Sequence, residues 1–321
     1  MVLTVTINPL LERRYYYTVI DLSLANRDGE VIIKAGGKGI NVSRQLNKIG
    51  ISNMALVFTG GSNGKQFREA LRIEGINYSD IVIKDETRDA AIIVDEGKRK
   101  ICSFFGKNSS VTTSEANEFI SKMEKAIATC EIVVFSGSSP CKEAEKIFYE
   151  GISIANRLDK ISICDTYGNH LEACINASPT IIHNNVDEIE NSLDLSLKSE
   201  KDQLNLLESL YKKGIKQVYI TNDSKPFYTS NFDFHYKVTL PEINTSDSTG
   251  SGDAFVAGLV YGWHKKLTFE EQLRFASTLG VSNATSLEVC DVSLKEANSL
   301  TEKIQIEAVG KKLKTINDNP G

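Results

Sequence analysis

Short apolar segments alternate with helical segments over most of the chain, and this alternation constrains the fold more than any other feature of the sequence. Between successive apolar segments lie stretches such as residues 40–49, in which Val42, Leu46 and Ile49 fall on one helical face. This order predicts a mostly parallel sheet covered by helices on both faces, that is, a three-layer αβα sandwich. The predicted strands are residues 3–7, 55–58, 132–135, 161–164, 180–183 and 218–221.

Two regions break the alternation. Residues 13–34 and 88–105 are rich in β-forming residues and contain no helical stretch. In the second region, a turn at Glu96-Gly97 separates two such runs and predicts a hairpin. We expect the two regions to form a small sheet that stands apart from the main one.

The composition excludes several classes of protein. Hydrophobic residues make up 41% and charged residues 25% of the 321 positions, which is typical of a folded globular domain. The formal net charge of −5 and the lack of a basic block argue against nucleic acid or an anionic membrane as a partner. We find neither a signal peptide nor a membrane span, so we expect a cytoplasmic protein whose six cysteines are reduced thiols.

The segment 247–258 carries the strongest chemical signal. Glycines alternate with small residues at Gly250, Ser251 and Gly252, and an apolar run follows that predicts a buried helix. Backbone N–H groups at a helix N-terminus bind anions such as phosphate. The carboxylate of Asp253 would lie beside such a phosphate and could accept the proton of an attacking hydroxyl. The alternative is a glycine-rich turn in which Asp253 caps the helix.

A second glycine motif, residues 35–42, opens the helix at 40–49. Gly37 and Gly39 permit close approach of the backbone to a ligand. Lys38 could meet a substrate phosphate, and Asn41 can donate and accept hydrogen bonds to hydroxyls. Alone this motif is weak, since such sequences also occur in solvated turns.

Together the two motifs resemble the PfkB (ribokinase-like) family of carbohydrate kinases, whose signatures are G-G-K-G-x-N and D-T-x-G-A-G-D. They occur here at 36–41 and 247–253, in the family's order and about 210 residues apart. The opening segment 4–9 resembles the branch that phosphorylates sugar phosphates, which includes 1-phosphofructokinase, tagatose-6-phosphate kinase and the minor 6-phosphofructokinase.

The resemblance implies an ATP- and Mg²⁺-dependent kinase of a ketohexose phosphate, with Asp253 as general base and Gly250, Ser251 and Gly252 as the anion hole. It implies a core of residues 1–11, 35–86 and 107–321, covered at the sugar site by a β lid of residues 12–34 and 87–106 that pairs in a homodimer. The residues implied to bind the phosphosugar are Glu12, Gly37, Lys38, Asn41, Arg88 and Ser138. Those implied for the nucleotide are Asn185, Thr221, Asp223, Ser224 and Thr249, with Glu188 binding the metal and Asn185 reaching it through water.

The chain departs from the family pattern at three places. Glu12 stands where the branch has Asp, His183-Asn184 replace Lys-Pro before the N-x-x-E motif, and 221–226 lack both glycines of the T-L-G-x-x-G loop. A longer acid at position 12 would shift the oxygens that bind sugar hydroxyls. Asp223 would repel a nucleotide phosphate unless it points away.

Other interpretations of these residues stay open. Asn185 and Glu188 also fit a helix-capping pair, Ser138 a turn cap and Arg88 a surface residue of the hairpin. The chain could be a kinase of an unphosphorylated sugar or nucleoside, or a weakly active protein that senses sugar phosphates. Residues 60–66 look like a nucleotide-binding P-loop, but the spacing is one residue short and Gln66 replaces the required Ser or Thr, so we exclude it.

Overall fold

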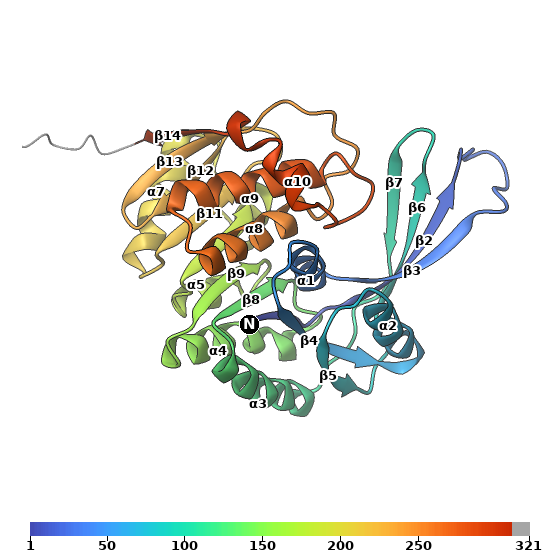
Figure 1. Ribbon diagram of the computed structural model, residues 1–321. Coiled ribbons are helices and arrows are strands. Elements are labelled where there is room, and N and C mark those ends of the chain that lie inside the picture. Colours follow the sequence, from blue (N-terminus) through green and yellow to red (C-terminus); the bar gives the residue numbers. More distant parts are fainter. Residues whose placement is uncertain (310–321) are drawn as a thin grey trace, which may run out of the picture.

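A computed structural model describes residues 1–309 and contains two sheets (Figure 1). The strands of the larger sheet are β1 (Val2–Thr6), β4 (Asn53–Gly60), β5 (Tyr78–Ile83), β8 (Ile132–Gly137), β9 (Ile161–Thr166), β10 (Ile181–Asn185), β11 (Gln217–Thr221), β12 (Phe227–Asn231), β13 (Phe234–Thr239) and β14 (Gln305–Val309). Their order across the sheet is β14-β13-β12-β11-β10-β9-β8-β1-β4-β5. All pairs from β11 to β5 are parallel, and β12, β13 and β14 extend the sheet in antiparallel fashion.

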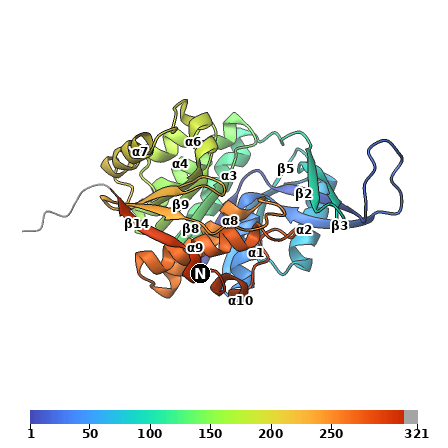
Figure 2. The ribbon, with the colours of Figure 1, turned by 90° about the horizontal axis from the view of Figure 1, so that it is seen from above.

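Helices cover both faces of this sheet. They are α1 (Lys38–Lys48), α2 (Gly61–Ile73), α3 (Thr113–Thr129), α4 (Lys142–Arg157), α5 (Leu171–Asn176), α6 (Val186–Leu193), α7 (Glu200–Lys212), α8 (Ser251–Lys265), α9 (Phe269–Asn283), α10 (Leu294–Asn298) and the 3₁₀ turn η1 (Thr301–Lys303). Figure 2 shows α3, α4, α6 and α7 on one side of the strands and α1, α8, α9 and α10 on the other.

The central strands are buried on both faces, as a covered parallel sheet requires. Val133 and Phe135 of β8 pack with α3 and α4, whereas the alternate residues Ile132 and Val134 pack with α1, α8 and α9. This division into two apolar clusters produces the continuous apolar runs seen in the sequence. The predicted α/β class, with a mostly parallel sheet between helical layers, is confirmed.

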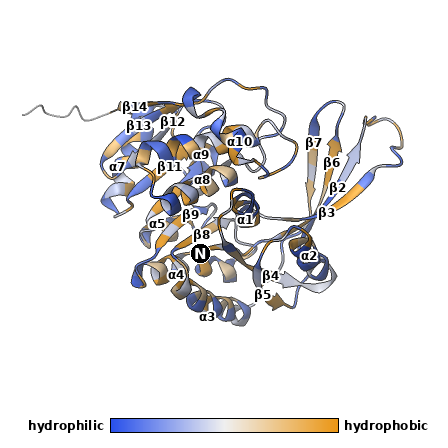
Figure 3. Cartoon of the chain, viewed as in Figure 1, coloured by the Kyte–Doolittle hydropathy of each residue, from blue (hydrophilic) through white to orange (hydrophobic). Residues whose placement is uncertain are grey.

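The smaller sheet stands off the main body (Figure 1). It contains β2 (Leu10–Tyr17), β3 (Glu30–Gly36), β6 (Asp89–Asp95) and β7 (Lys100–Phe105), in the order β3-β2-β6-β7. Strands β2 and β6 are parallel although they come from the two separate β-rich regions, and the predicted hairpin is the β6–β7 pair. Apolar residues of its outer strands are exposed, including Val31 at 50% and Phe104 at 61%. Figure 3 shows the hydrophobic segments of this sheet in orange.

The sequence did not reveal β5 or the antiparallel extension β12–β14. No helical segment separates β11, β12 and β13, so the alternation rule did not apply to them. The last residues of the predicted core segment 107–321 lie outside the described part of the chain. Within residues 1–309, no helix is both long and apolar enough to cross a membrane.

Candidate active site

One cavity of about 770 Å³ lies where the ends of the parallel strands meet the small sheet. Its wall is formed by strands of the small sheet, the start of α1, the ends of β10 and β11, and the start of α8. All the site residues predicted from the sequence line it except Ser138: Glu12, Gly37, Lys38, Asn41, Arg88, Asn185, Glu188, Thr221, Asp223, Ser224, Thr249, Gly250, Ser251, Gly252 and Asp253.

The glycine loop ends at Gly250, which is the N-cap of α8 and has a φ of 79°. A Cβ at this position would lie 2.3 Å from Cγ1 of Val289, so both conformation and space require glycine. The first turn of α8 lines the cavity and brings to it the partial positive charge of a helix N-terminus, although the Ser251 N–H also donates to the Ser248 carbonyl oxygen at 3.1 Å.

Asp253 lies in this first turn and does not cap the helix, so the capping alternative is wrong for this residue. Its side chain is buried, and Oδ2 accepts a hydrogen bond of 2.7 Å from Nδ2 of Asn41. Burial raises the pKa of Asp253 to about 7, with the charge of Lys38 opposing and that of Asp165 adding to the shift. A carboxylate with such a pKa can take a proton near neutral pH.

Lys38 lies among carboxylates. Its Nζ is 2.6 Å from Glu188 Oε1 and 3.5 Å from Asp165 Oδ1, and it lies 4.9 Å from the centre of the Tyr167 ring. Burial acts to lower the pKa of Lys38, but the carboxylates of Asp165, Glu188 and Asp253 outweigh it and hold this pKa above its ordinary value. Lys38 therefore carries a full positive charge close to Asp253.

Arg88 has a different environment. Its guanidinium donates to the carbonyl oxygens of Asn8 (3.2 Å) and Pro9 (3.4 Å) and to Oδ1 of Asn108 (3.1 Å). Neutral oxygens thus orient this cation, and burial lowers its pKa. Ser138 lies beside this group, because its Oγ accepts a hydrogen bond of 3.0 Å from Nδ2 of Asn8. A half-buried cation held in this way is suited to bind an anionic ligand.

Asn185 and Glu188 form a capping box at the start of α6. Asn185 Oδ1 accepts from the Glu188 N–H at 2.7 Å, and the Asn185 N–H donates to Glu188 Oε2 at 3.2 Å. The capping interpretation is therefore correct as geometry. It leaves Glu188 Oε1 directed toward Lys38 at the cavity, so the same side chain is available to a ligand.

These donors fit a magnesium ion that is bound mainly by nucleotide phosphates and water. Within residues 1–309 no cluster of three or more His, Cys, Asp or Glu side chains is arranged to hold a metal alone. Magnesium in phosphoryl-transfer sites characteristically uses one or two protein carboxylates. Glu188 lines the cavity, and Oδ2 of buried Asp165 has no hydrogen-bond partner.

The turn after β11, residues 221–226, lacks the two glycines that the family resemblance led us to expect. Asp223 has a φ of 49°, the left-handed conformation that a glycine would adopt there, and Asp tolerates this region better than most residues. The Lys225 N–H donates to the Asn222 carbonyl at 2.9 Å and closes the turn. Next to it, apolar residues that the sequence did not single out line the cavity: Leu240, Pro241, Ile243, Val281 and Ala284.

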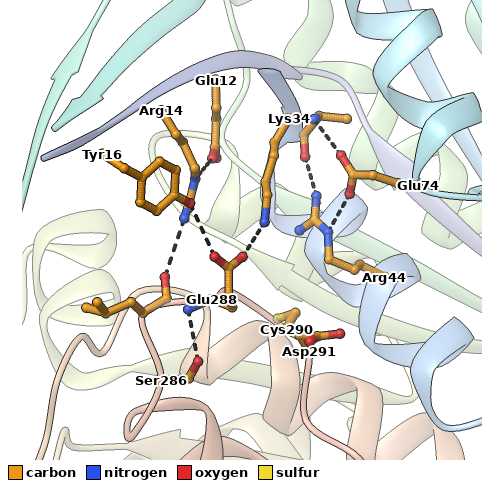
Figure 4. Close-up of polar contacts among 12 residues, drawn as sticks. Glu12, Arg14, Tyr16, Lys34, Arg44, Glu74, Ser286, Glu288, Cys290 and Asp291 are labelled. Carbon is orange, nitrogen blue, oxygen red and sulfur yellow. Dashed lines mark hydrogen bonds and ion pairs between the residues drawn. The ribbon is translucent and has the colours of Figure 1, made fainter. Parts of the chain in front are cut away.

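Glu12 is tied to a second residue that sequence reasoning missed. The Arg14 Nε donates to Glu12 Oε2 at 2.8 Å, and the arginine is 3% exposed (Figure 4). A Cβ at Gly36 would lie 2.3 Å from Glu12 Oε1, so this glycine makes room for the longer acid. Arg14 and Gly36 thus fix the orientation of the Glu12 carboxylate.

Two further polar residues escaped the sequence analysis, Asp165 and Tyr167, and a third, His183, was noted there only as a departure from the family pattern. Asp165 is fully buried and bonds His183 Nδ1 at 2.9 Å, and His183 stacks on Phe255 of α8 with ring centres 5.1 Å apart. Both Asp165 and His183 lie near the carboxyl ends of parallel strands, where open α/β sheets bind ligands. That position was the available signal.

The P-loop-like segment is occupied by the protein itself. The Glu86 carboxylate accepts hydrogen bonds from the Asn63 N–H and from Ser62 Oγ at the start of α2. A Cβ at Gly61 would clash with the same carboxylate. An internal acid therefore takes the place that a phosphate has in a nucleotide-binding P-loop, which agrees with the exclusion of this motif.

A parallel sheet with a glycine-capped helix and an adjacent buried carboxylate at its carboxyl edge defines a phosphotransferase of small molecules with an alcohol as acceptor. Residues 15–296 match the family described as pfkB family carbohydrate kinase. The chain belongs to this family.

Proteins of known name agree with this assignment. A tagatose-6-phosphate kinase of Staphylococcus epidermidis is 28% identical over 309 residues, which cover 95% of this chain and 99% of the relative. A solved structure described as a possible 1-phosphofructokinase of Thermotoga maritima is 27% identical with a TM-score of 0.88, covering 96% and 99% of the two chains. Phosphofructokinase-2 of Escherichia coli, solved with potassium, shares the fold at 20% identity and a TM-score of 0.84, covering 94% and 98% of the two chains.

Proposed function

We propose that the protein transfers the γ-phosphoryl group of ATP to a free hydroxyl of a ketohexose phosphate, with fructose 1-phosphate, fructose 6-phosphate and tagatose 6-phosphate as the candidate acceptors. The observation that carries the proposal is Asp253, a buried carboxylate with a pKa of about 7 in the first turn of α8. It shares one cavity with Arg88, a half-buried cation oriented by neutral oxygens. A base and an anion receptor in one cavity match an acceptor that bears both a hydroxyl and a phosphate.

The acceptor would lie under the small sheet, its phosphate on Arg88 and Ser138 with Lys38 contributing charge from the opposite side. Glu12 and Asn41 would bind its other hydroxyls. In this arrangement the small sheet would act as a lid over the acceptor, as the sequence resemblance implies. The exposed apolar strands of the lid favour a homodimer formed through it.

ATP would lie along the other half of the cavity. The apolar wall beside Asp223 and Ser224 suits an adenine ring, and Thr221, Asn185 and Thr249 lie along the path to the glycine loop. Magnesium, which Glu188 would hold directly and Asn185 through water, neutralises phosphate charge when bound.

In the transfer step the acceptor oxygen forms a bond to the γ-phosphorus while the bond to the β–γ bridging oxygen breaks. Asp253 takes the hydroxyl proton. The N–H groups of Gly250, Ser251 and Gly252, together with the N-terminus of α8, stabilise the charge on the transferred group. Lys38 keeps part of the Asp253 population ionised at neutral pH, because its charge opposes the effect of burial on the pKa.

The test is ADP release from ATP-Mg²⁺ with the three candidate phosphosugars and with fructose, ribose and adenosine. We expect turnover with one phosphosugar and none with the unphosphorylated compounds. Asp253→Asn should lower kcat by at least about 10²-fold with little change in acceptor binding, the size expected for a general base. Turnover with free sugars alone would replace the proposal, and an unchanged kcat in Asp253→Asn would remove Asp253 from its role.

Thermal unfolding supplies a control that the variant folds. The pKa of Asp253 is raised in the folded state, so the folded protein is penalised for ionising it as pH rises toward 7 and above. Asp253→Asn should therefore unfold at the same or a higher temperature than the wild type at pH 8. A lower unfolding temperature would mean that its loss of activity reflects damage to the fold.

A further inference from the structure

The face of the lid that turns toward the body carries a polar group that reaches the loop after α9 (Figure 4). The group consists of Glu12, Arg14, Tyr16, Lys34 and Glu288. Three of them alternate along β2 and therefore point to the same face, and Lys34 lies opposite Glu12 in β3. The fifth, Glu288, belongs to the loop.

Glu288 joins the two strands to the loop. Its carboxylate accepts hydrogen bonds from Lys34 Nζ and, at 3.2 Å, from the hydroxyl of Tyr16. Beside it, Arg14 Nη1 donates to the Leu287 carbonyl at 3.4 Å. The Leu287 side chain packs against a lid cluster of Leu10, Ala90, Ile92 and Val94. Charge and apolar contact therefore hold residues 287–288 to the lid.

The next two residues contact the glycine loop instead. Cγ1 of Val289 occupies the space beside Gly250 that a Cβ would need, and Cys290 Sγ lies 3.3 Å from the Gly250 carbonyl oxygen. Asn283 accepts from the Cys290 N–H at 2.7 Å and donates to the Thr249 carbonyl at 2.8 Å. Residues 289–290 thus support the anion-binding loop from behind.

Consecutive Cα atoms are about 3.8 Å apart, so a shift of Glu288 with the lid displaces Val289 once it exceeds what rotation about the intervening backbone bonds absorbs. We propose that Glu288 is a positioning residue that couples the lid to the anion-binding loop, so that Gly250–Gly252 reach their transfer geometry when β2 and β3 lie against residues 287–290. The inference rests on the proposed function for its kinetic consequences and on geometry for the coupling itself.

The coupling predicts cooperative binding of the two substrates. An acceptor that contacts Glu12 favours the closed lid, because Arg14 ties Glu12 to the Leu287 carbonyl. The closed lid favours the loop geometry that binds the transferred phosphate. Coupling between two sites is reciprocal, so the phosphosugar should raise the affinity for nucleotide as much as nucleotide raises that for the phosphosugar.

The first test compares Glu288→Gln, Lys34→Met and the double variant. The binding of a non-hydrolysable ATP analogue is measured by calorimetry with and without the phosphosugar. The phosphosugar should strengthen binding to the wild type at least about 5-fold, the lower end of typical coupling, and should strengthen it clearly less in the variants, which keep the contact of Arg14 with the Leu287 carbonyl. We expect kcat to fall about tenfold, while the Kd of the ATP analogue without phosphosugar stays within about threefold. The double variant should lose less than the sum of the two single variants, because both remove the ion pair between Lys34 and Glu288.

Lys48→Met is the matched control. Lys48 pairs with Asp291, one residue beyond the supporting segment, at 2.8 Å, but it belongs to α1 and not to the lid. This variant should keep the coupling and kcat of the wild type. The charge-reversed pair Lys34→Glu with Glu288→Lys should restore part of the coupling. Equal losses in Lys48→Met and Glu288→Gln would overturn the proposal, since the loop would then have only a structural role.

Hydrogen exchange tests the coupling without any substrate, and so separates its failure from failure of the proposed function. The lid keeps a second attachment through Arg99, which donates to Ser246 Oγ at 3.1 Å, so Glu288→Gln should fold. We expect faster exchange in β2 and β3 and also in residues 248–252. Faster exchange in the lid with an unchanged glycine loop would refute the coupling, whether or not any sugar phosphate is turned over.

Discussion

The two ends of the cavity use positive charge in opposite ways. At the acceptor end, neutral carbonyl and amide oxygens orient Arg88, and its charge is free to attract a ligand. At the transfer end, Lys38 pairs with Glu188 and Asp165, and these carboxylates largely neutralise its charge. Arg88 and Lys38, to which the sequence resemblance assigned one role, therefore have different surroundings and are suited to different roles. One suits binding, and the other suits control of the base.

The largest expected effect separates these roles at the acceptor end. Arg88→Met should raise the KM for the phosphosugar about 10²-fold or more, because a charged hydrogen bond to phosphate is lost, while kcat at saturation changes much less. Steady-state kinetics with both substrates varied would show this split. The KM of Arg88→Lys for the phosphosugar should lie between those of the wild type and Arg88→Met, since lysine keeps the charge but loses the fork geometry of the guanidinium. A kcat effect without a KM effect would contradict the anchor role.

An intermediate effect is expected at the transfer end. In the wild type, kcat/KM should rise with pH through about 7 as Asp253 loses its proton. Lys38 lowers this pKa, so Lys38→Met should move the rising limb about 1 to 3 pH units upward, the shift typical of losing a nearby opposite charge. Its KM for the phosphosugar should rise less than that of Arg88→Met. An unmoved limb with a large KM increase would make Lys38 a second phosphate anchor of the same kind as Arg88.

The smallest effect concerns the nucleotide turn, which lies at neither cation. Asp223→Gly should stabilise the protein by up to about 1 kcal/mol, because glycine adopts the left-handed conformation without strain. It should also lower the KM for ATP a few-fold, since a negative charge leaves the cavity wall. Chemical denaturation and ATP titration measure the two effects, and Asp223→Asn serves as the control that removes charge but keeps the side chain. Weaker ATP binding in both variants would show that the carboxylate contributes to nucleotide binding.

The fold was predictable because its central strands obey a simple rule. Strands such as β1 and β8 are apolar on both faces and are followed by helices, so the alternation indicated a covered parallel sheet. Two of the strands that escaped prediction, β13 and β14, have mixed surroundings. β13 and β14 are largely half-exposed or exposed near one edge of the sheet, and their sequences lack a continuous apolar run.

The residues that line the cavity were predictable where they lie in contiguous motifs. Gly250 to Asp253 and Gly37 to Asn41 each occupy a few consecutive positions, and the fold brings both to one cavity. Pairs of residues that are distant in the sequence and meet only in the folded structure form no such motif. Lys38 meets Glu188 across 150 positions, and Tyr16 meets Glu288 across 272. The sequence alone did not indicate that Lys38 would be paired with acids. Nor did it indicate that the lid would contact residues 287–288, next to the residues that pack behind the glycine loop.

The place of β1 has a consequence for how the chain matures during synthesis. This strand comprises residues 2–6, yet it lies between β4 and β8, so its second neighbour is not made until residue 137 has been added. Until then the nascent sheet presents an apolar strand with one unpaired edge, which is a hazard for association with other chains. The bond between Asn41 and Asp253 spans 212 positions and forms still later. We therefore expect slow folding that depends on completion of nearly the whole chain, with catalytic competence appearing at its end.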